Sequence, residues 1–164
     1  MLLPFFSAIL LHEFGHIFFL LLTGGKLRGL RISVLGITLK ADFPPSYSAK
    51  ILISLGGPFV GFFCYFLFRN AGISLSLFAD ISLALSLFNL LPISFLDGGC
   101  ALESFFLLFL PYDRATLWIH GLSIAMAILI WGVAIYLFLF LNGSASLFLF
   151  SLWFLFSLLF SQKA

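Results

Sequence analysis

Long apolar runs, separated by short polar segments, set the pattern of the chain. An α-helix needs about 20 predominantly apolar residues to cross the hydrocarbon core of a bilayer. Runs of spanning length fall at residues 3–22, 50–68, 74–91, 115–141 and 145–161. The pattern therefore predicts an all-α polytopic membrane protein with about five transmembrane helices.

Two further segments depart from this pattern. Segment 27–42 alternates apolar and polar residues, is rich in β-branched side chains and carries Gly36 near its centre. These features predict a small β-hairpin at the membrane surface, after which Pro44 and Pro45 break the chain. Segment 100–110 is apolar but too short to cross a membrane. It is therefore predicted to form a re-entrant or interfacial helix.

The composition excludes several classes of protein. The chain is 63% hydrophobic and only 9% charged, whereas a soluble domain carries far more charge. Its net charge is only +2 and its basic residues gather in one loop, so nucleic acid is not an expected partner. The first apolar run has no basic stretch before it, unlike a cleaved signal peptide. Cys64 and Cys100 are expected to be small buried residues rather than disulfide partners or metal ligands.

The distribution of basic residues predicts the orientation in the membrane, because cytoplasmic loops carry an excess of Lys and Arg. Five basic residues fall between the first two predicted spans: Lys26, Arg28, Arg31, Lys40 and Lys50. With loop 23–49 in the cytoplasm, the N-terminus is external, the C-terminus is cytoplasmic, and seven basic residues lie inside against one, Arg69, outside. We therefore expect a multi-pass protein of the cell membrane in this orientation, with the hairpin on the cytoplasmic side.

The first predicted span contains the most informative motif, His12-Glu13-Phe14-Gly15-His16. Residues four apart share one face of a helix, so His12 and His16 can bind one metal ion together. Glu13 follows the first histidine and can act as general base toward a metal-bound water. Ionisable residues within a span are costly and usually functional. In the predicted orientation His16 lies about 9 Å below the cytoplasmic edge of the apolar core.

A catalytic zinc site needs a third protein ligand, because it holds three and leaves one position open. Asp97 stands out because Pro92 ends a helix before it, and Gly98-Gly99 after it let the backbone turn sharply. This setting places the carboxylate at the inner end of the third span, at the depth inferred for the histidines. The alternative is an ordinary turn aspartate. Glu103 is another acidic candidate, for which capping or solvating the short helix is the preferred role.

Other residues have both a structural and a functional interpretation. Gly57 and Gly61 have the four-residue spacing of closely packed membrane helices, and packing is the favoured interpretation. The alternative is a kinked, non-helical edge that pairs with an extended substrate. Asp80 is expected to mark the outer end of the third span. His120 is expected to be an interfacial histidine near the cytosol, with contact to a substrate as the alternative.

Three motifs together carry a resemblance to a known family. They are His12-Glu13-Phe14-Gly15-His16, Gly56-Gly57-Pro58, and Asn89-Leu90-Leu91-Pro92 leading to Leu96-Asp97-Gly98-Gly99. In order and spacing, over about residues 5–110, they resemble the site-2 protease family of intramembrane zinc metalloproteases, peptidase family M50. The sporulation branch, whose protease releases a sigma factor from its precursor, is the most similar.

The resemblance implies a set of functional residues. One zinc ion is expected to be held by His12, His16 and Asp97, with Glu13 as the base. Asn89 is implied as a nearby polar residue that steadies the substrate or the oxyanion. The resemblance also implies that these groups act within the membrane and that the substrates are membrane proteins.

The resemblance also implies how the chain is organised. A catalytic core at about residues 1–110 and additional spans at 115–161 are expected to form one domain over residues 1–164. Phe95 stands where the family often has a second proline, and Gly61 stands where it often has a polar residue. The sporulation branch usually has a preceding span and a terminal regulatory domain, so the chain is expected to be a minimal or truncated core.

Two functions of different classes fit these residues. The favoured one is an intramembrane zinc endopeptidase, in which Glu13 helps a zinc-bound water attack a peptide carbonyl of a membrane-embedded or membrane-associated substrate. The substrate helix has to unwind locally, since helical carbonyls are internally bonded, and a gating membrane protein is a possible partner. The alternative is a catalytically silent membrane protein that binds metal or a partner. Retention of Glu13 favours the enzyme.

Overall fold

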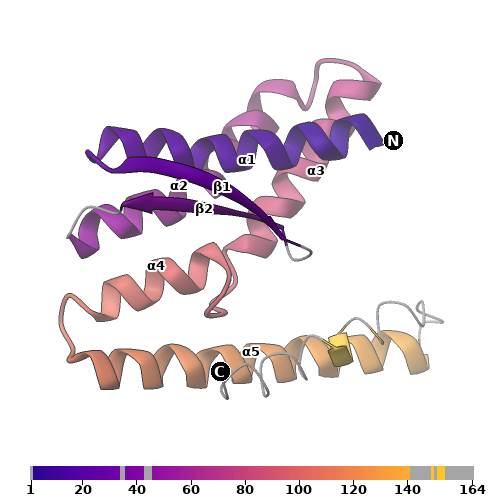
Figure 1. Cartoon of the computed structure of the whole chain (residues 1–164). Helices are drawn as coiled ribbons and strands as arrows, with labels where there is room; N and C mark the ends of the chain where they lie inside the picture. The colour runs from indigo at the N-terminus through magenta and orange to yellow at the C-terminus, as the bar shows by residue number, and fades with distance from the viewer. Residues whose placement is uncertain (1, 34–35, 43–45, 141–148, 150, 154–164) are drawn as a thin grey trace.

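A computed structural model describes residues 2–33, 36–42, 46–140, 149 and 151–153, with side chains in 27–42 left undescribed. Figure 1 shows the arrangement of its helices and strands. In chain order these elements are α1 (Leu2–Leu22), β1 (Lys26–Ser33), β2 (Gly36–Asp42), α2 (Tyr47–Phe68), α3 (Ile73–Asn89), α4 (Asp97–Phe106) and α5 (Tyr112–Phe140).

The long helices coincide with the predicted spans. α1, α2 and α5 are long and apolar enough to cross a membrane, and each begins within about three residues of its predicted start. α3 is also apolar but has 17 residues, a length of about 26 Å at the helical rise. The prediction of an all-α membrane protein is confirmed. The count of five spans stays a prediction, since the last, at 145–161, lies largely outside the described residues.

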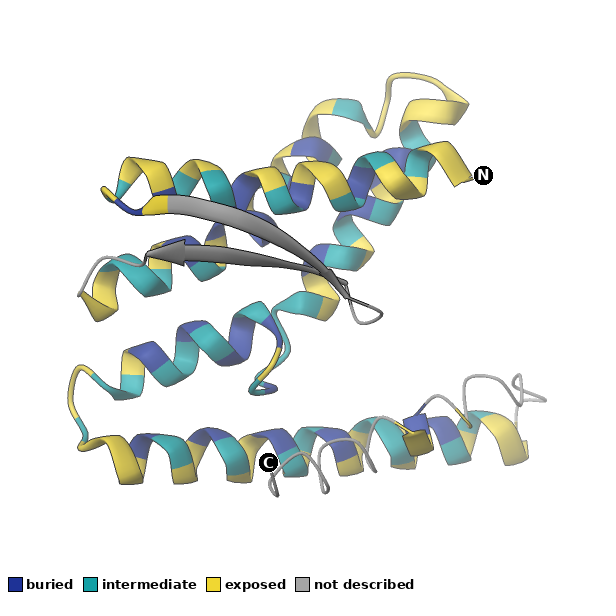
Figure 2. Ribbon diagram, viewed as in Figure 1, coloured by how far each residue is buried: buried dark blue, intermediate teal, exposed yellow. Residues whose placement is uncertain are grey.

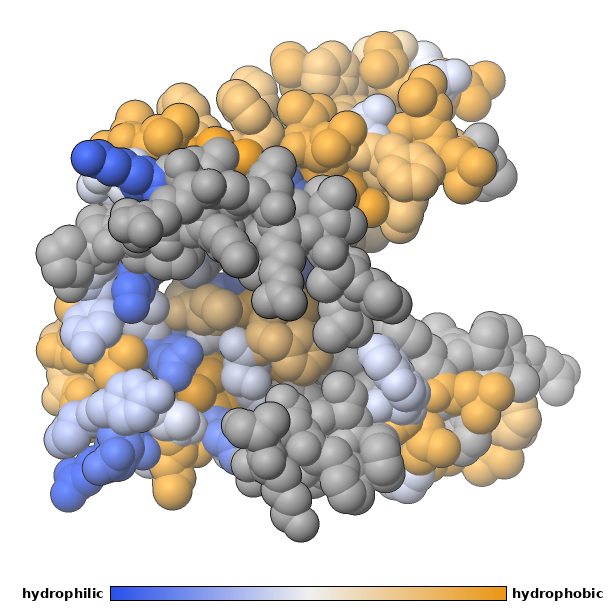
Figure 3. Space-filling view, viewed as in Figure 1, coloured by the Kyte–Doolittle hydropathy of each residue, from blue (hydrophilic) through white to orange (hydrophobic). Residues whose placement is uncertain are grey.

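Burial is inverted relative to a water-soluble protein. Leu3, Phe66 and Ile73 are 79%, 78% and 92% exposed, and apolar side chains cover much of the surface of α1 to α3 in Figure 3. Several polar side chains are buried together with the apolar core, namely His12, His16, Ser82, Ser86 and Ser123. Figure 2 shows buried and exposed positions alternating along the long helices. Water would penalise such a surface, whereas lipid favours it, so the chain is a membrane-embedded protein.

Glycines determine how closely the central helices pack. α2 lies against α1, α3 and α4. A Cβ on Gly15 of α1 would overlap the backbone carbonyl of Gly56, and a Cβ on Gly61 would overlap the Ser86 hydroxyl of α3. The packing interpretation is therefore confirmed for Gly61. The non-helical edge of the alternative interpretation is wrong, because α2 is helical from Tyr47 to Phe68 with Pro58 inside it.

The segment between α1 and α2 contains two paired strands. β1 and β2 are antiparallel, with Lys26 opposite Asp42 and Ser33 opposite Gly36, and the register is irregular between Leu27 and Gly29. β1 follows α1 closely in the chain and contacts it. The location of this pair on the cytoplasmic side stays a prediction.

The connection from α3 to α4 brings Asp97 into the interior. α3 ends at Asn89, and the loop 90–96 then leads into α4, whose first residue is Asp97. The predicted sharp turn at Gly98-Gly99 is wrong, because both glycines lie in the first turn of α4. They are small for another reason: a Cβ on Gly98 would overlap the Leu90 carbonyl, and one on Gly99 the Ile93 carbonyl.

Two other expectations about position are corrected. Asp80 does not mark the end of a span, because it is the eighth residue of α3, and it is exposed near the middle of that helix. The short helix predicted at 100–110 begins three residues earlier and ends at Phe106. Its start was misplaced because two adjacent glycines usually indicate a turn, whereas here close packing requires them. α5 packs against α4 along one side of the molecule, as Figure 1 shows.

Candidate metal centre

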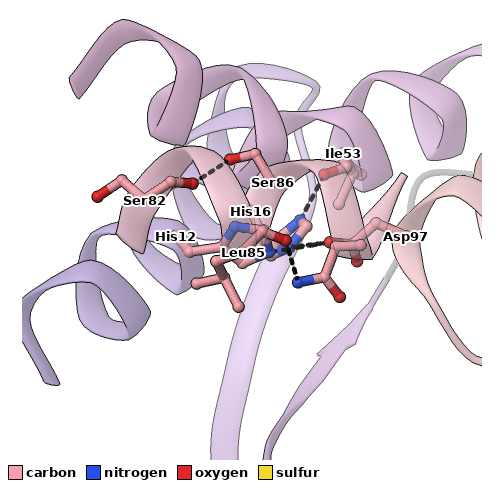
Figure 4. Close-up of polar contacts among 8 residues, drawn as sticks. His12, His16, Ile53, Ser82, Leu85, Ser86 and Asp97 are labelled. Carbon is pink, nitrogen blue, oxygen red and sulfur yellow. Dashed lines mark hydrogen bonds and ion pairs between the residues drawn. The ribbon is translucent and has the colours of Figure 1, made fainter. Parts of the chain in front are cut away.

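Helix α1 supplies two buried histidines on one face. His12 and His16 are only 5% and 8% exposed, although most of the other residues of α1 are apolar and many of them are exposed. Their rings are edge to face, with centroids 5.0 Å apart. The four-residue spacing of the motif therefore does what the sequence predicted: it turns both imidazoles toward the same interior point (Figure 4).

Helix α4 brings a carboxylate to the same point. Asp97 Oδ2 lies 2.9 Å from His12 Nε2 and 3.2 Å from His16 Nε2. One nitrogen from each histidine and one carboxylate oxygen lie within 4.8 Å of one another. The structure thus brings together the three residues expected as metal ligands, across a separation of 85 positions between His12 and Asp97. Figure 4 shows both rings pointing toward Asp97.

A backbone carbonyl of α2 fixes the orientation of His16. His16 Nδ1 is 2.8 Å from the Ile53 carbonyl oxygen, which can only accept a hydrogen bond. The proton of a neutral ring is therefore on Nδ1, and Nε2 presents a lone pair toward Asp97. A lone pair facing a carboxylate at 3.2 Å is unfavourable unless a positive charge lies between them. The donor pattern therefore fits a cation shared by His16 and Asp97.

His12 is held differently. Its Nδ1 is buried and has no hydrogen-bond partner among the described residues. Its Nε2 contacts Asp97 Oδ2 at 2.9 Å. The ring is therefore positioned by α1 and by the group around Asp97, without the backbone anchor that His16 has. Among the described residues, no group therefore fixes His12 at Nδ1 in the way that the Ile53 carbonyl fixes His16.

Gly57 of α2 lies directly against the two Nε2 atoms. A Cβ on this residue would overlap His16 Nε2 and come within 2.6 Å of His12 Nε2. The absence of a side chain at this position therefore allows both imidazole rings to approach α2 closely. Two imidazole nitrogens and one carboxylate oxygen are a donor set that zinc uses in catalytic sites, where a fourth position stays open. The residues present fit a zinc ion.

Glu13 lies beside this group, and Asn89 ends helix α3. Glu13 is partly buried on α1, and its carboxylate interacts electrostatically with His16, His12 and Asp97. Asn89 is the last residue of α3, and its Nδ2 donates to the Leu85 carbonyl at 3.0 Å. Their expected roles, base for Glu13 and substrate contact for Asn89, stay predictions.

The other candidates are not part of the group. Among the described residues the cluster contains His12, His16 and Asp97, and Glu103 is not a member although it is on the same helix as Asp97. His120 is partly buried on α5, and its Nε2 has no hydrogen-bond partner in the described part of the chain. Substrate contact by His120 also stays a prediction.

Sequence reasoning missed two contributions to this site. The Ile53 carbonyl that orients His16 belongs to the backbone, so the residue types in the sequence do not distinguish it from other carbonyls. For Gly57 the sequence predicts helix packing or an edge that pairs with substrate, but not the contact with both ligand nitrogens that the structure shows. The sequence did contain a signal for the role of Gly57. Gly56 and Gly57 are adjacent glycines, although one glycine suffices for a helix crossing.

Fold and site together define a class: a membrane-embedded protein with a buried centre of two histidines and one carboxylate. Comparison with protein families agrees. Residues 5–96 match the family model described as Peptidase M50B-like, which covers more than half of the 164 residues. The chain belongs to this M50B-like peptidase family. The matched segment includes His12, Glu13 and His16, and ends one residue before Asp97.

A solved structure shares the fold. The site-2 protease from Methanocaldococcus jannaschii is similar with a TM-score of 0.70 over 99% of this chain and 77% of the other, at 23% sequence identity. A comparison with curated proteins found no match.

Proposed function

We propose that the chain is an intramembrane zinc metalloendopeptidase that cleaves a peptide bond of membrane-embedded or membrane-associated proteins. Membership of the M50B-like peptidase family supports protease activity. The observation that carries the proposal is the convergence of ligand atoms of His12, His16 and Asp97 within 4.8 Å of one another. A zinc ion held there would polarise the scissile carbonyl and make water a better nucleophile at neutral pH.

The roles proposed for the protein's own residues follow from their placement. His16, oriented by the Ile53 carbonyl, keeps its Nε2 lone pair toward the centre. Glu13 is adjacent to His12 and partly buried, which suits a carboxylate that accepts a proton from the attacking water and passes it to the leaving amine. Asn89 has its amide nitrogen bonded to its own helix, and we assign its carbonyl oxygen or its second N–H to substrate contact.

The substrate and its route follow from the membrane setting. A transmembrane helix presents no free carbonyl, because its backbone is internally bonded, so the substrate has to unwind near the site. A second membrane protein that gates access remains part of the proposal, as do the external N-terminus, the cytoplasmic loop 23–49 and the cytoplasmic C-terminus. The similarity to the sporulation sigma-factor branch likewise remains a prediction from the motifs.

Metal binding gives the first test. Purified wild-type protein should bind one zinc ion per chain, and Asp97→Asn should bind it at least ~10-fold more weakly, because an amide lacks the charge of a carboxylate ligand. Asp80→Asn is the matched control: this exposed aspartate lies outside the group and its loss should leave zinc affinity unchanged. Unchanged affinity in Asp97→Asn would contradict the ligand assignment and make Glu103 the next residue to test.

Cleavage distinguishes the enzyme from a silent binding protein. Wild type in lipid vesicles should cleave a single-span membrane substrate, lose this activity on chelation and regain it when zinc is added back. A protein that binds zinc but cleaves none of several such substrates, with a gating partner supplied, would favour the silent alternative.

A further inference from the structure

Helix α5 touches the loop that carries Asp97 through one buried hydroxyl. Ser123 of α5 is fully buried. Its Oγ donates to the Ile119 carbonyl on its own helix at 2.7 Å and accepts from the Ser94 backbone N–H at 2.9 Å. A hydroxyl has one proton. With that proton on Ile119, the oxygen is left as an acceptor directed at Ser94.

The same peptide segment is held on its other side. The Cys100 thiol lies 3.6 Å from the Ser94 carbonyl, so Ser94 is contacted by α5 through its N–H and by α4 through its carbonyl. The loop is compact between these contacts, with Ile93 N–H bonded to Leu91 and Leu96 N–H bonded to Ile93. Ser94 therefore has little freedom to move independently of α4 and α5.

Packing reinforces this contact. Ile93 and Leu96 of the loop and Ala127 of α5 form one buried cluster, at 0%, 8% and 1% exposure. Ala127 is four residues after Ser123, so both lie on the face of α5 that meets the loop. The small Ala127 side chain permits the close approach that the hydrogen bond needs.

The position of the loop backbone determines the position of Asp97. A Cβ on Gly99 would overlap the Ile93 carbonyl and approach the Ser94 nitrogen to 2.8 Å, and one on Gly98 would overlap Leu90. The first turn of α4 thus rests on the loop backbone, with no flexible side chain between them. Asp97 begins that turn, so a displacement of Ser94 displaces the carboxylate.

We propose that Ser123 is a positioning residue for the metal centre, acting from α5 through Ser94 on Asp97. The inference rests on the proposed zinc site and adds α5 to the elements that define it. Its consequence is that zinc affinity depends on the docking of α5, a helix that supplies no ligand to the His12–His16–Asp97 group.

The test measures metal binding in the full chain, independently of activity. Zinc affinity is measured by competition with a chelator, and the visible absorption of the cobalt form reports ligand geometry. Ser123→Ala should weaken zinc binding by about 10-fold or more, the effect usual for residues that orient metal ligands, and should change the cobalt spectrum. Ala127→Val, which pushes the loop and α5 apart, should act in the same direction.

Ser82→Ala is the matched control. Ser82 is a buried serine that donates to a carbonyl four residues earlier, as Ser123 does, but on α3. Its loss should change zinc affinity by less than about 2-fold, because it orients no ligand. A double-mutant cycle supplies the second control: once Asp97 is replaced by Asn, Ser123→Ala should have little further effect, since it acts through Asp97.

The outcomes separate this inference from the proposed function. A wild type that binds neither zinc nor cobalt overturns both. A wild type that binds zinc, with Ser123→Ala and Ala127→Val indistinguishable from Ser82→Ala, overturns the positioning role alone. Equal effects of Ser123→Ala with and without Asp97 overturn it as well.

Discussion

At the scale of single residues, the metal centre depends on how each ligand side chain is held in place. His16 Nδ1 donates to the Ile53 carbonyl, so the Nε2 atom of a neutral ring directs its lone pair toward the centre. Gly57 lets the Nε2 atoms of both histidines approach α2 closely. A metal ion bound there would meet a prearranged ligand, which lowers the cost of assembling the site.

Gly57→Ala tests whether zinc binding needs this close approach of the histidines to α2. The new methyl group would overlap His16 Nε2 and crowd His12 Nε2, so zinc affinity should fall by at least ~10-fold, as measured by chelator competition. Gly121→Ala on α5 is the control, because a Cβ there meets nothing within 4 Å, and it should bind zinc as wild type does. Wild-type zinc affinity in Gly57→Ala would show that zinc binding does not depend on the close approach of Gly57 to the histidines.

Residue types in the sequence predicted much of this group. A histidine pair at helical spacing in an apolar run and a carboxylate after a proline were sufficient to nominate His12, His16 and Asp97. The sequence could not reveal the Ile53 carbonyl or the Ser94 N–H, because every residue has a backbone carbonyl, every residue except proline has a backbone N–H, and only the folded chain selects among them.

At the scale of helices, small residues decide the geometry. The crossing of α1 and α2 brings backbone against backbone at Gly15 and Gly56, which places Gly57 beside the histidines. The crossing of α2 and α3 has a side chain, Ser86, as its closest contact with Gly61. The nearest atoms to a Cβ on Gly15 all belong to the backbone, whereas a Cβ on Gly61 would first meet the Ser86 hydroxyl, a side-chain group that can move.

This difference predicts an order of stabilities. Gly15→Ala should destabilise the protein more than Gly61→Ala, each by roughly 1–3 kcal/mol or more, the range typical of overpacking. Ser86→Ala should partly rescue Gly61→Ala and leave Gly15→Ala unimproved. Thermal unfolding in detergent measures all four variants. Equal destabilisation without rescue would contradict the assignment of these contacts.

Element boundaries show where sequence patterns succeed and fail. Apolar runs located the long helices because lipid requires a minimum apolar length. Gly98-Gly99 was misjudged because glycine indicates either a turn or a close approach, and only the position of Leu90 and Ile93 distinguishes them. Asp80 was misplaced because a charge was assumed to lie at the end of a span, whereas it is exposed within α3.

At the scale of the whole molecule, charges and tyrosines mark two ends. Lys50 lies over the Tyr47 ring at the start of α2, and Arg69 lies over the Tyr65 ring at its end. Eighteen positions separate these tyrosines, or about 27 Å of helix, which matches the thickness of an apolar core. Tyrosines and basic residues are typical of the two interfaces, and hydrophilic residues gather along one edge of Figure 3.

Labelling from outside the cell tests which end faces the cytoplasm. Ser46→Cys, just before α2, should be shielded from an impermeant thiol reagent in intact cells, and Asn70→Cys, just after α2, should react. Both positions are exposed, and wild type serves as the blank because Cys64 is buried and Cys100 is partly buried. The reverse labelling pattern would overturn the predicted orientation.

Glu13→Gln probes whether this membrane centre performs hydrolysis with Glu13 as its base. The substitution keeps the size of the side chain and removes the proton acceptor, while the three proposed zinc ligands remain. Zinc should stay bound, and cleavage of a single-span substrate should fall by about 10²–10⁴. Glu103→Gln, on a partly buried glutamate outside the group, should cleave at the wild-type rate. Full zinc occupancy with undiminished cleavage in Glu13→Gln would show that Glu13 is not the base.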